Sequence, residues 1–407
     1  MKEKNELAVD RVLRGFLADH LHTIILILLF VCSVLLRIRL APETALSSDY
    51  ELYIKGWPER YRELGFVRGM GEVIGDYYVP FNIMYAVIGL SPWEPWVLAS
   101  VFSCIFDYLI AGVVFALARY LYEQRGDVLA VRKAAYLSAL TCYLPVVFMN
   151  SALWKQCDGM YIFFALLAVY LILRDRATPA FAMLGISFSF KFQAVFFLPF
   201  FCLLYLLKKN FSILQFLWIP GIYFISGLPA VFCRRGLRAT YGTYFMQMLE
   251  GTSAGTAATS EDYGMVANYP NLYNYGLDDY LTTMALPAAL FTLMLLLVSV
   301  GAAWWKRDRL NDVKLLFLLA WQIWACNMFL PSMHERYDYG AVLLFALLVA
   351  MIPRESVIPA AVLNVGTYIT YLRAAAVDIV SIHVLTAVYI AAFLWTSREL
   401  VRCLKKR

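Results

Sequence analysis

Long apolar runs constrain the fold of this chain more than any other feature. Leu286–Trp305 has the length that an α-helix needs to cross a bilayer, and Thr23–Leu36 forms the centre of another such run. Hydrophobic residues make up 62% of the 407 residues and charged residues only 16%. Soluble domains are about half apolar and about a quarter charged. The sequence therefore predicts an all-α polytopic membrane protein.

The apolar runs divide into about twelve predicted transmembrane helices, which puts both chain ends on the same side. Two of them, 179–190 and 193–207, are shorter than the roughly 20 residues that a full crossing needs. They are either two short helices that meet at Lys191 or one long bent helix, and the second choice would turn the rest of the chain over. The predicted spans are 22–40, 97–118, 134–150, 158–173, 179–190, 193–207, 211–231, 284–305, 313–330, 338–352, 356–373 and 378–396.

Basic residues favour two short helices. Most Lys and Arg residues cluster between the spans on the side that this topology makes cytoplasmic, as the positive-inside rule requires. One bent helix would instead put Lys306, Arg307 and the basic end of the chain outside. Because topology accounts for the net charge of +6, we expect no nucleic-acid partner. The first apolar run lacks a small-residue cleavage site, so we expect it to be retained.

This topology gives two long external loops, 41–96 and 233–283. Val79–Leu90 is apolar enough for a further span, but counting it as one would put the basic segment 119–133 outside. We therefore expect an interfacial or re-entrant helix there. Most of the eight cysteines lie inside apolar runs, which argues against a disulfide framework. The predicted division is 1–21 as a cytoplasmic N-terminus, 22–232 as a first transmembrane module with the external loop 41–96, 233–283 as the second external loop, 284–396 as a second transmembrane module and 397–407 as a basic cytoplasmic tail.

Asp49 is the first candidate for chemistry, early in the first external loop. Tyr50, Tyr53 and Trp57 follow it, and a carboxylate beside aromatic rings can hold a sugar and take a proton from a hydroxyl group. The alternative is a helix N-cap, a position that Asp favours. Asp76 lies near the end of the same loop, and there too a capping role for the helix at 79–90 is an open alternative.

A second polar stretch joins the predicted third and fourth spans. It contains Trp154, Lys155, Gln156 and Asp158. Anchoring at the membrane interface would explain the tryptophan and the lysine, but it needs neither the amide nor the carboxylate. We therefore favour a functional role for this stretch.

Two further groups of polar residues fall on the external side. Lys191, followed by Gln193, interrupts an apolar run, where a lysine must reach water or an anion. It either extends to the interface or contacts a phosphate. The segment 331–338 is the densest external cluster. It offers an imidazole, a carboxylate, a guanidinium suited to phosphate and a phenol, from His334, Glu335, Arg336 and Tyr337.

External arginines suggest contact with an anionic lipid head, although ordinary phospholipid headgroups would also explain them. They are Arg37 and Arg39 at the outer end of the first span, and Arg234, Arg235 and Arg238 at the start of the second loop. Asp107 lies near mid-depth in the second span. It has either a functional role or a buried hydrogen bond to a neighbouring helix.

In this order, the motifs resemble those of the GT-C superfamily of membrane glycosyltransferases, particularly bacterial proteins similar to the GPI-anchor and dolichyl-phosphate-mannose-dependent mannosyltransferases. The resemblance covers about residues 22 to 350. In one position Lys155 stands where the family usually has glycine. The matching features are Asp49 with Tyr53 and Trp57, Asp76-Tyr77-Tyr78-Val79-Pro80, Asn150 to Asp158, Lys191-Phe192-Gln193 with Pro199, and His334-Glu335-Arg336-Tyr337.

The resemblance implies an inverting transfer of a single hexose, of mannose, glucose or galactose type, from a polyprenyl-phosphate donor. The acceptor would be a lipid-linked glycan or a cell-envelope polysaccharide at the outer face of a bacterial plasma membrane. Asp49 matches the catalytic base. The expected donor-phosphate ligands are Lys191, His334 and Arg336, then Arg234 and Arg235. The expected sugar or acceptor contacts are Trp154, Lys155, Gln156, Asp158, Gln193, Glu335, Tyr337, Tyr53, Trp57 and Asp76.

The resemblance implies no obligatory cofactor, and a divalent metal ion is compatible with Asp158 but not required. A lipid-linked glycan flippase or transporter is the alternative from another functional class. Such proteins often have inverted repeats and a mid-membrane site, whereas this sequence has no internal repeat and only Asp107 as a clear mid-depth charge. A glycan ligase or polymerase, which transfers whole glycans, is a variant of the first hypothesis.

Overall fold

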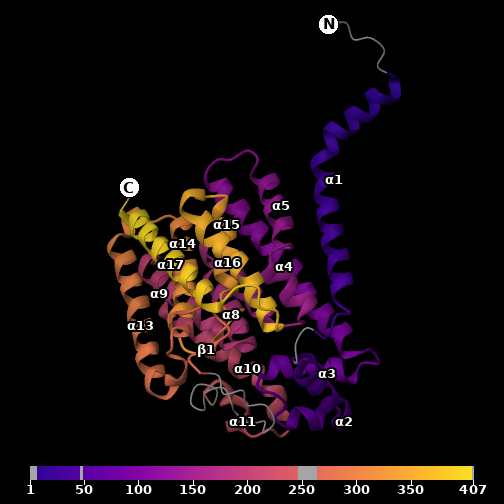
Figure 1. The fold of residues 1–407 in the computed structure, drawn as a ribbon, viewed down its shortest axis with the longest axis vertical. Helices are drawn as coiled ribbons and strands as arrows, with labels where there is room; N and C mark the ends of the chain where they lie inside the picture. Colours follow the sequence, from indigo (N-terminus) through magenta and orange to yellow (C-terminus); the bar gives the residue numbers. More distant parts are fainter. Residues whose placement is uncertain (1–6, 46–48, 246–263, 406–407) are drawn as a thin grey trace.

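The computed structural model describes residues 7–45, 49–245 and 264–405, and these residues are almost entirely helical (Figure 1). Their only strands, β1 (Val266–Ala267) and β2 (Met333–His334), form one short parallel pair. Five helical segments are long and apolar enough to cross a membrane, and a pair of helices bent by 52° adds a sixth if it forms one span. The prediction of an all-α polytopic membrane protein is therefore confirmed.

Each of the twelve predicted spans overlaps a helical segment, although several of these segments, such as α7, α8 and α15, are too short to count as crossings by length alone. The α-helices are α1 (Ala8–Leu40), α2 (Gly56–Gly71), α3 (Val79–Leu90), α4 (Pro95–Gln124), α5 (Ala130–Thr141), α6 (Pro145–Phe148), α7 (Asp158–Leu173), α8 (Ala177–Phe190), α9 (Leu198–Leu207), α10 (Trp218–Phe232), α11 (Leu237–Tyr241), α13 (Leu281–Trp305), α14 (Asp312–Phe329), α15 (Tyr339–Val349), α16 (Pro353–Ala374) and α17 (Ile382–Lys405). Two π-helical segments, η1 (Tyr50–Lys55) and η2 (Met149–Leu153), and the 3-10 segment η3 (Phe192–Phe197) lie near the site described below.

The chain reverses direction at Lys191, between α8 and η3. Lys191 has an extended backbone (φ −152°, ψ 137°), and its amine pairs with Asp158 at the start of α7. At the far end of α9, Lys208 donates hydrogen bonds to the carbonyl oxygens of Ile172 (3.2 Å) and Leu173 (3.4 Å), which end α7. Helices α8 and α9 are therefore antiparallel. Two short helices are confirmed here, and the single bent helix is wrong.

Helices α2 and α3 of the first loop lie crosswise to the long helices, at the end of the molecule opposite both termini (Figure 1). Their packing is close, since a Cβ on Gly89 would lie 2.1 Å from the carbonyl oxygen of Pro58. Helix α3 has 12 residues, which is too short for a crossing. The prediction of a helix at 79–90 that adds no span agrees with these dimensions.

Both ends of the chain are more helical than the sequence predicts. Helix α1 begins at Ala8 instead of residue 22, and α17 continues to Lys405, so helix covers most of the basic tail predicted at 397–407. In α17 the buried face continues through Leu400 and Leu404 while Arg398 lies outside it, a pattern with helical spacing. Residues 1–6 and 406–407 of the predicted termini, and 246–263 of the predicted second loop, lie outside the described residues.

Arg37 does not face lipid headgroups, and that expectation is wrong. Its guanidinium is buried (4% exposed), its Nη2 lies 2.8 Å from Oδ2 of Asp107, and Nη2 also donates to the carbonyl oxygen of Cys142 (3.1 Å). The hydroxyl of Ser151 donates to the same carboxylate (2.5 Å). The structure thus favours the buried hydrogen bond for Asp107. Arg37, Asp107 and Ser151 therefore connect α1, α4 and η2. Burying either charge without the other would be costly, so the ion pair stabilises this contact.

Candidate active site

The candidate site lies where several chain reversals meet. Asp158 begins α7, Lys191 separates α8 from η3, and the segment 333–338 connects β2 to α15. Pairing of Ala267 with His334 also brings part of the loop predicted at 233–283 to this segment. Residues far apart in the sequence therefore share one end of the bundle.

Asp158 is the centre of the charged network. It is fully buried, and one of its oxygens forms a close ion pair with the amine of Lys191. Its other oxygen, Oδ2, accepts a hydrogen bond from Nδ2 of Asn150 (3.1 Å) and lies 3.4 Å from Nε of Arg336. Two cations and an amide donor thus hold this buried carboxylate in position. Removing one of the cations would leave an uncompensated buried charge.

His334, Glu335 and Arg336 form the adjoining part of the network. Nη1 of Arg336 donates to Oε1 of Glu335 (2.6 Å), and Nδ1 of His334 lies 3.8 Å from Oε2. Burial opposes ionisation of Glu335, but Arg336 and His334 outweigh it and lower the pKa of Glu335 to about 2. Burial and the Arg336 charge lower the pKa of His334, so its imidazole is neutral near pH 7.

The charges in this network are largely balanced. Lys191 pairs with Asp158, Arg336 pairs with Glu335, and His334 is neutral. The sequence suggested a surplus of positive charge here, whereas the folded chain places a carboxylate beside each permanent cation. Even so, Nε of Arg336 and Oε2 of Glu335 are buried without a hydrogen bond to any described residue. Such atoms need an explanation, and a bound polar ligand is one.

Aromatic rings flank the two cations. The amine of Lys191 lies 4.8 Å from the ring centre of Tyr337, and the guanidinium of Arg336 lies 5.5 Å from that of Trp154. Trp154 in turn packs edge-on against Tyr371 of α16, with ring centres 5.2 Å apart. These contacts hold the cations at defined places.

Asp49 belongs to the same network. Nε2 of Gln156 donates to its Oδ2 (2.8 Å), and Trp154 donates a second hydrogen bond. Burial raises the pKa of Asp49, Arg336 opposes the rise and Glu335 adds to it. Asp49 immediately precedes η1, but its side chain does not cap that helix, so the N-cap alternative is wrong. Its carboxylate instead faces residues of the second polar stretch.

Tyr53, Trp57 and Asp76 complete the part of the site that the first loop provides. Trp57 contacts Tyr53 (ring centres 5.1 Å apart) and lies over Gly75, whose φ of +72° and close approach leave no room for a Cβ. Asp76 does not cap α3, whose N-cap residue is Tyr78 without a side-chain cap bond. Burial of its carboxyl group raises the pKa of Asp76, while the charges of Lys191 and Arg336 oppose the rise.

Lys155 holds the first loop against the second polar stretch. Its backbone is left-handed (φ 56°), a conformation that glycine adopts without cost. Its buried amine donates to the carbonyl oxygens of Glu43, of Leu153 (3.1 Å) and of Ala152 (3.4 Å). Two of these carbonyls belong to the end of η2, where carbonyl groups need partners. Burial lowers the pKa of Lys155 to about 8.

Three predicted residues are not joined to this network. Arg235 is buried elsewhere, where Nε donates to the carbonyl oxygen of Met70 (3.0 Å) and Nη1 to Oδ1 of Asn82 (2.8 Å). Arg234 is exposed and lines a recess beside α2. Gln193 is half-buried in η3 and forms no hydrogen bond with a described residue. The contacts of Arg235 indicate that it connects α2 to α3.

Two partners of the network were not among the predicted site residues. The amide of Asn150 donates hydrogen bonds to Asp158 and to the hydroxyl of Tyr371 (3.2 Å). The sequence motif Asn150 to Asp158 included Asn150 but gave it no role. Tyr371 lies in an ordinary apolar helix, and no sequence pattern distinguishes it.

No group of three or more His, Cys, Asp or Glu side chains could hold a metal ion among residues 7–45, 49–245 and 264–405. The cysteines described in these ranges are all free thiols. The sequence matches no known protein family, and no curated protein matches it either.

Proposed function

We propose that this chain is an inverting glycosyltransferase of GT-C type that uses a polyprenyl-phosphate-linked hexose. The observation that carries the proposal is that Asp49 lies in one network with Arg336 and Lys191. These three residues are remote in sequence: Asp49 and Arg336 come from two different loops, and Lys191 comes from the break between α8 and η3. This arrangement supports a carboxylate base beside a phosphate-binding group. The resemblance of the ordered motifs supports the same assignment.

In the proposed reaction, Asp49 takes the proton of an acceptor hydroxyl as that oxygen attacks the anomeric carbon. The new glycosidic bond forms while the bond from the anomeric carbon to the phosphate oxygen breaks, and polyprenyl phosphate leaves with the electron pair. The raised pKa of Asp49 favours proton acceptance. Negative charge thereby moves from Asp49 to the leaving phosphate.

The leaving phosphate needs cations that gain interaction as its charge develops. Arg336 supports this role because its buried Nε forms no hydrogen bond with a described residue and lies 3.4 Å from Asp158, and Lys191 pairs with the other oxygen of Asp158. The neutral His334 can donate a hydrogen bond from its ring. Asp158 then orients both cations, and Trp154, Gln156 and Tyr337 flank the sugar.

The proposal includes the topology of twelve crossings, with both termini in the bacterial cytoplasm and the site on the outer face. The end of the bundle that carries the site lies away from both termini, which supports this orientation (Figure 1). A lipid-linked glycan or a cell-envelope polysaccharide would approach from that face. Membrane lipids complete the set of proposed partners.

The test uses the full chain in proteoliposomes with a polyprenyl-phosphate hexose and a lipid-linked glycan acceptor. Asp49→Asn should reduce transfer by at least about 100-fold, because a general base contributes about 10² to 10⁴. Glu51→Gln is the matched control, since Glu51 is exposed two residues further on and, among the described residues, forms an ion pair with Lys55 alone. Normal transfer by a folded Asp49→Asn protein would remove the base from the proposal.

The same vesicles distinguish the alternatives. Movement of the lipid-linked sugar across the bilayer without a new glycosidic bond would identify a flippase. Transfer of a whole glycan would identify a ligase or polymerase, so the mass added to the acceptor decides between these enzymes. A gain of one hexose is the expected result.

A further inference from the structure

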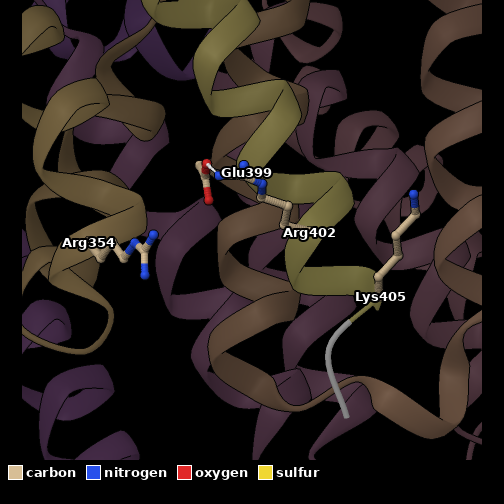
Figure 2. Close-up of a pocket in the computed structure, with 4 residues that line it drawn as sticks. All are labelled: Arg354, Glu399, Arg402 and Lys405. Carbon is tan, nitrogen blue, oxygen red and sulfur yellow. Dashed lines mark hydrogen bonds and ion pairs between the residues drawn. The ribbon is translucent and has the colours of Figure 1, made fainter.

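A second polar cavity lies at the opposite end of the bundle from the candidate active site. It has a volume of about 340 Å³ and is lined by Arg354, Glu399, Arg402 and Lys405 (Figure 2). Arg354 approaches from the start of α16, and the other three residues follow successive turns at the end of α17. A cavity of this size falls within the range of small-ligand sites.

The cavity has more positive than negative charge. Glu399 is buried (3% exposed) and forms a close ion pair with Arg402. Arg354 and Lys405 form no ion pair with any residue in the described ranges, so three cations share one carboxylate. Glu355, next to Arg354, is buried and has an interaction of its own. Arg354 and Lys405 are both exposed, so their positive charges are accessible to a ligand.

The backbone at this place also favours an anion. Helix α16 has 22 residues and begins with Pro353, and its N-cap residue Ile352 supplies no side-chain acceptor. The start of a helix carries partial positive charge and attracts phosphate groups. Val401, the residue before Arg402 in α17, presents apolar surface (49% exposed). An amphiphile could place its acyl chains there while its headgroup enters the cavity.

We propose that this cavity binds a phosphate group, which arrives either as the headgroup of an anionic phospholipid or as free phosphate. Arg354 supplies forked donors that fit phosphate oxygens, and Lys405 supplies a point charge. Glu399 and Arg402 line the cavity between them, and their ion pair holds the Arg402 side chain in place. Basic pockets between membrane helices bind anionic lipid headgroups in other membrane proteins. The site is separate from the proposed sugar-transfer site and does not depend on it.

The test measures binding to the purified full chain in neutral detergent, by native mass spectrometry and by the shift in melting temperature. The probes are phosphatidylglycerol, phosphatidylcholine and inorganic phosphate. Arg354→Gln/Lys405→Gln should weaken phosphatidylglycerol binding about tenfold or more, since each charged hydrogen bond contributes at least that factor. Arg176→Gln/Lys209→Gln removes two exposed charges at the same end but outside the cavity, and it should bind like the unaltered chain.

A third variant predicts a change of opposite sign. Glu399→Gln keeps the side-chain size but frees Arg402, so it should tighten anion binding, which structural damage would not do. If inorganic phosphate competes with phosphatidylglycerol, the site recognises the phosphate group alone, and if it does not, the lipid is the ligand. Equal weakening by the cavity variant and the surface control, or no binding of either anionic probe, would overturn the proposal.

Discussion

Lys155 offers a test in which glycine should be better than alanine. The residue has φ 56°, and a left-handed conformation costs an L-residue roughly 1–2 kcal/mol that glycine does not incur. Lys155→Ala and Lys155→Gly both remove the bonds from the amine to Glu43, Ala152 and Leu153. Only the alanine variant keeps the strain. The glycine variant should therefore be more stable by about 1 kcal/mol, the reverse of the usual preference for alanine.

Unfolding in detergent, followed by tryptophan fluorescence, measures this difference between the two variants. In sugar transfer, by contrast, the two variants should be alike. Both release the backbone of Glu43, which lies shortly before Asp49, and displacement of the proposed base should lower the transfer rate roughly 100-fold. Alanine at least as stable as glycine would refute the role of backbone strain. Full transfer by either variant would refute the role of the amine in holding the loop.

The same residue predicts a pH dependence of stability. The folded-state pKa of Lys155 is about 8, below the ordinary lysine pKa of 10.5, so the unfolded chain binds more protons between these values. Stability from this group should therefore rise with pH across that interval. Lys155→Met should flatten the rise in a pH series of unfolding measurements, and an unchanged slope would contradict the assignment.

Two further predictions concern the ion pairs. Arg37→Met or Asp107→Leu alone should lower the free energy of unfolding by about 3–5 kcal/mol. The double variant should recover most of that loss. Additive losses in thermal unfolding would show that the two residues are not coupled. Glu335 raises the pKa of Asp49 and Arg336 lowers it. In the pH profile of sugar transfer, Glu335→Gln should therefore move the acid limb to lower pH, and Arg336→Gln should move it to higher pH. The opposite shifts would exclude Asp49 as the group whose titration produces the acid limb.

Local sequence signals were sufficient for the helical segments and for the break at Lys191. Hydropathy is a property of each segment, and a charge within an apolar run must be placed where it finds water or a partner. The same reasoning put Asp49, Asp158 and Arg336 on one side of the membrane, and they do lie in one network. Topology predicts a shared side, however, and not which atoms meet.

Side-chain contacts between residues that are distant in the sequence could not be predicted from it. Arg37 looked like a headgroup ligand because its partner Asp107 is 70 residues away. Arg235 looked like a phosphate ligand, but its bonds to Met70 and Asn82 depend on how α2 and α3 pack. The balanced charge around Arg336 was missed for the same reason, since residue composition shows which charges are present but not how they pair.

The structure of the full chain bound to a polyprenyl phosphate tests the central claim most directly. The account predicts that the phosphate lies within about 3 Å of a nitrogen of Lys191 or Arg336, on the side that faces Asp49. A phosphate bound beside Arg234 and α2, or only in the cavity at Arg354, with the network around Asp158 left unoccupied, would contradict it.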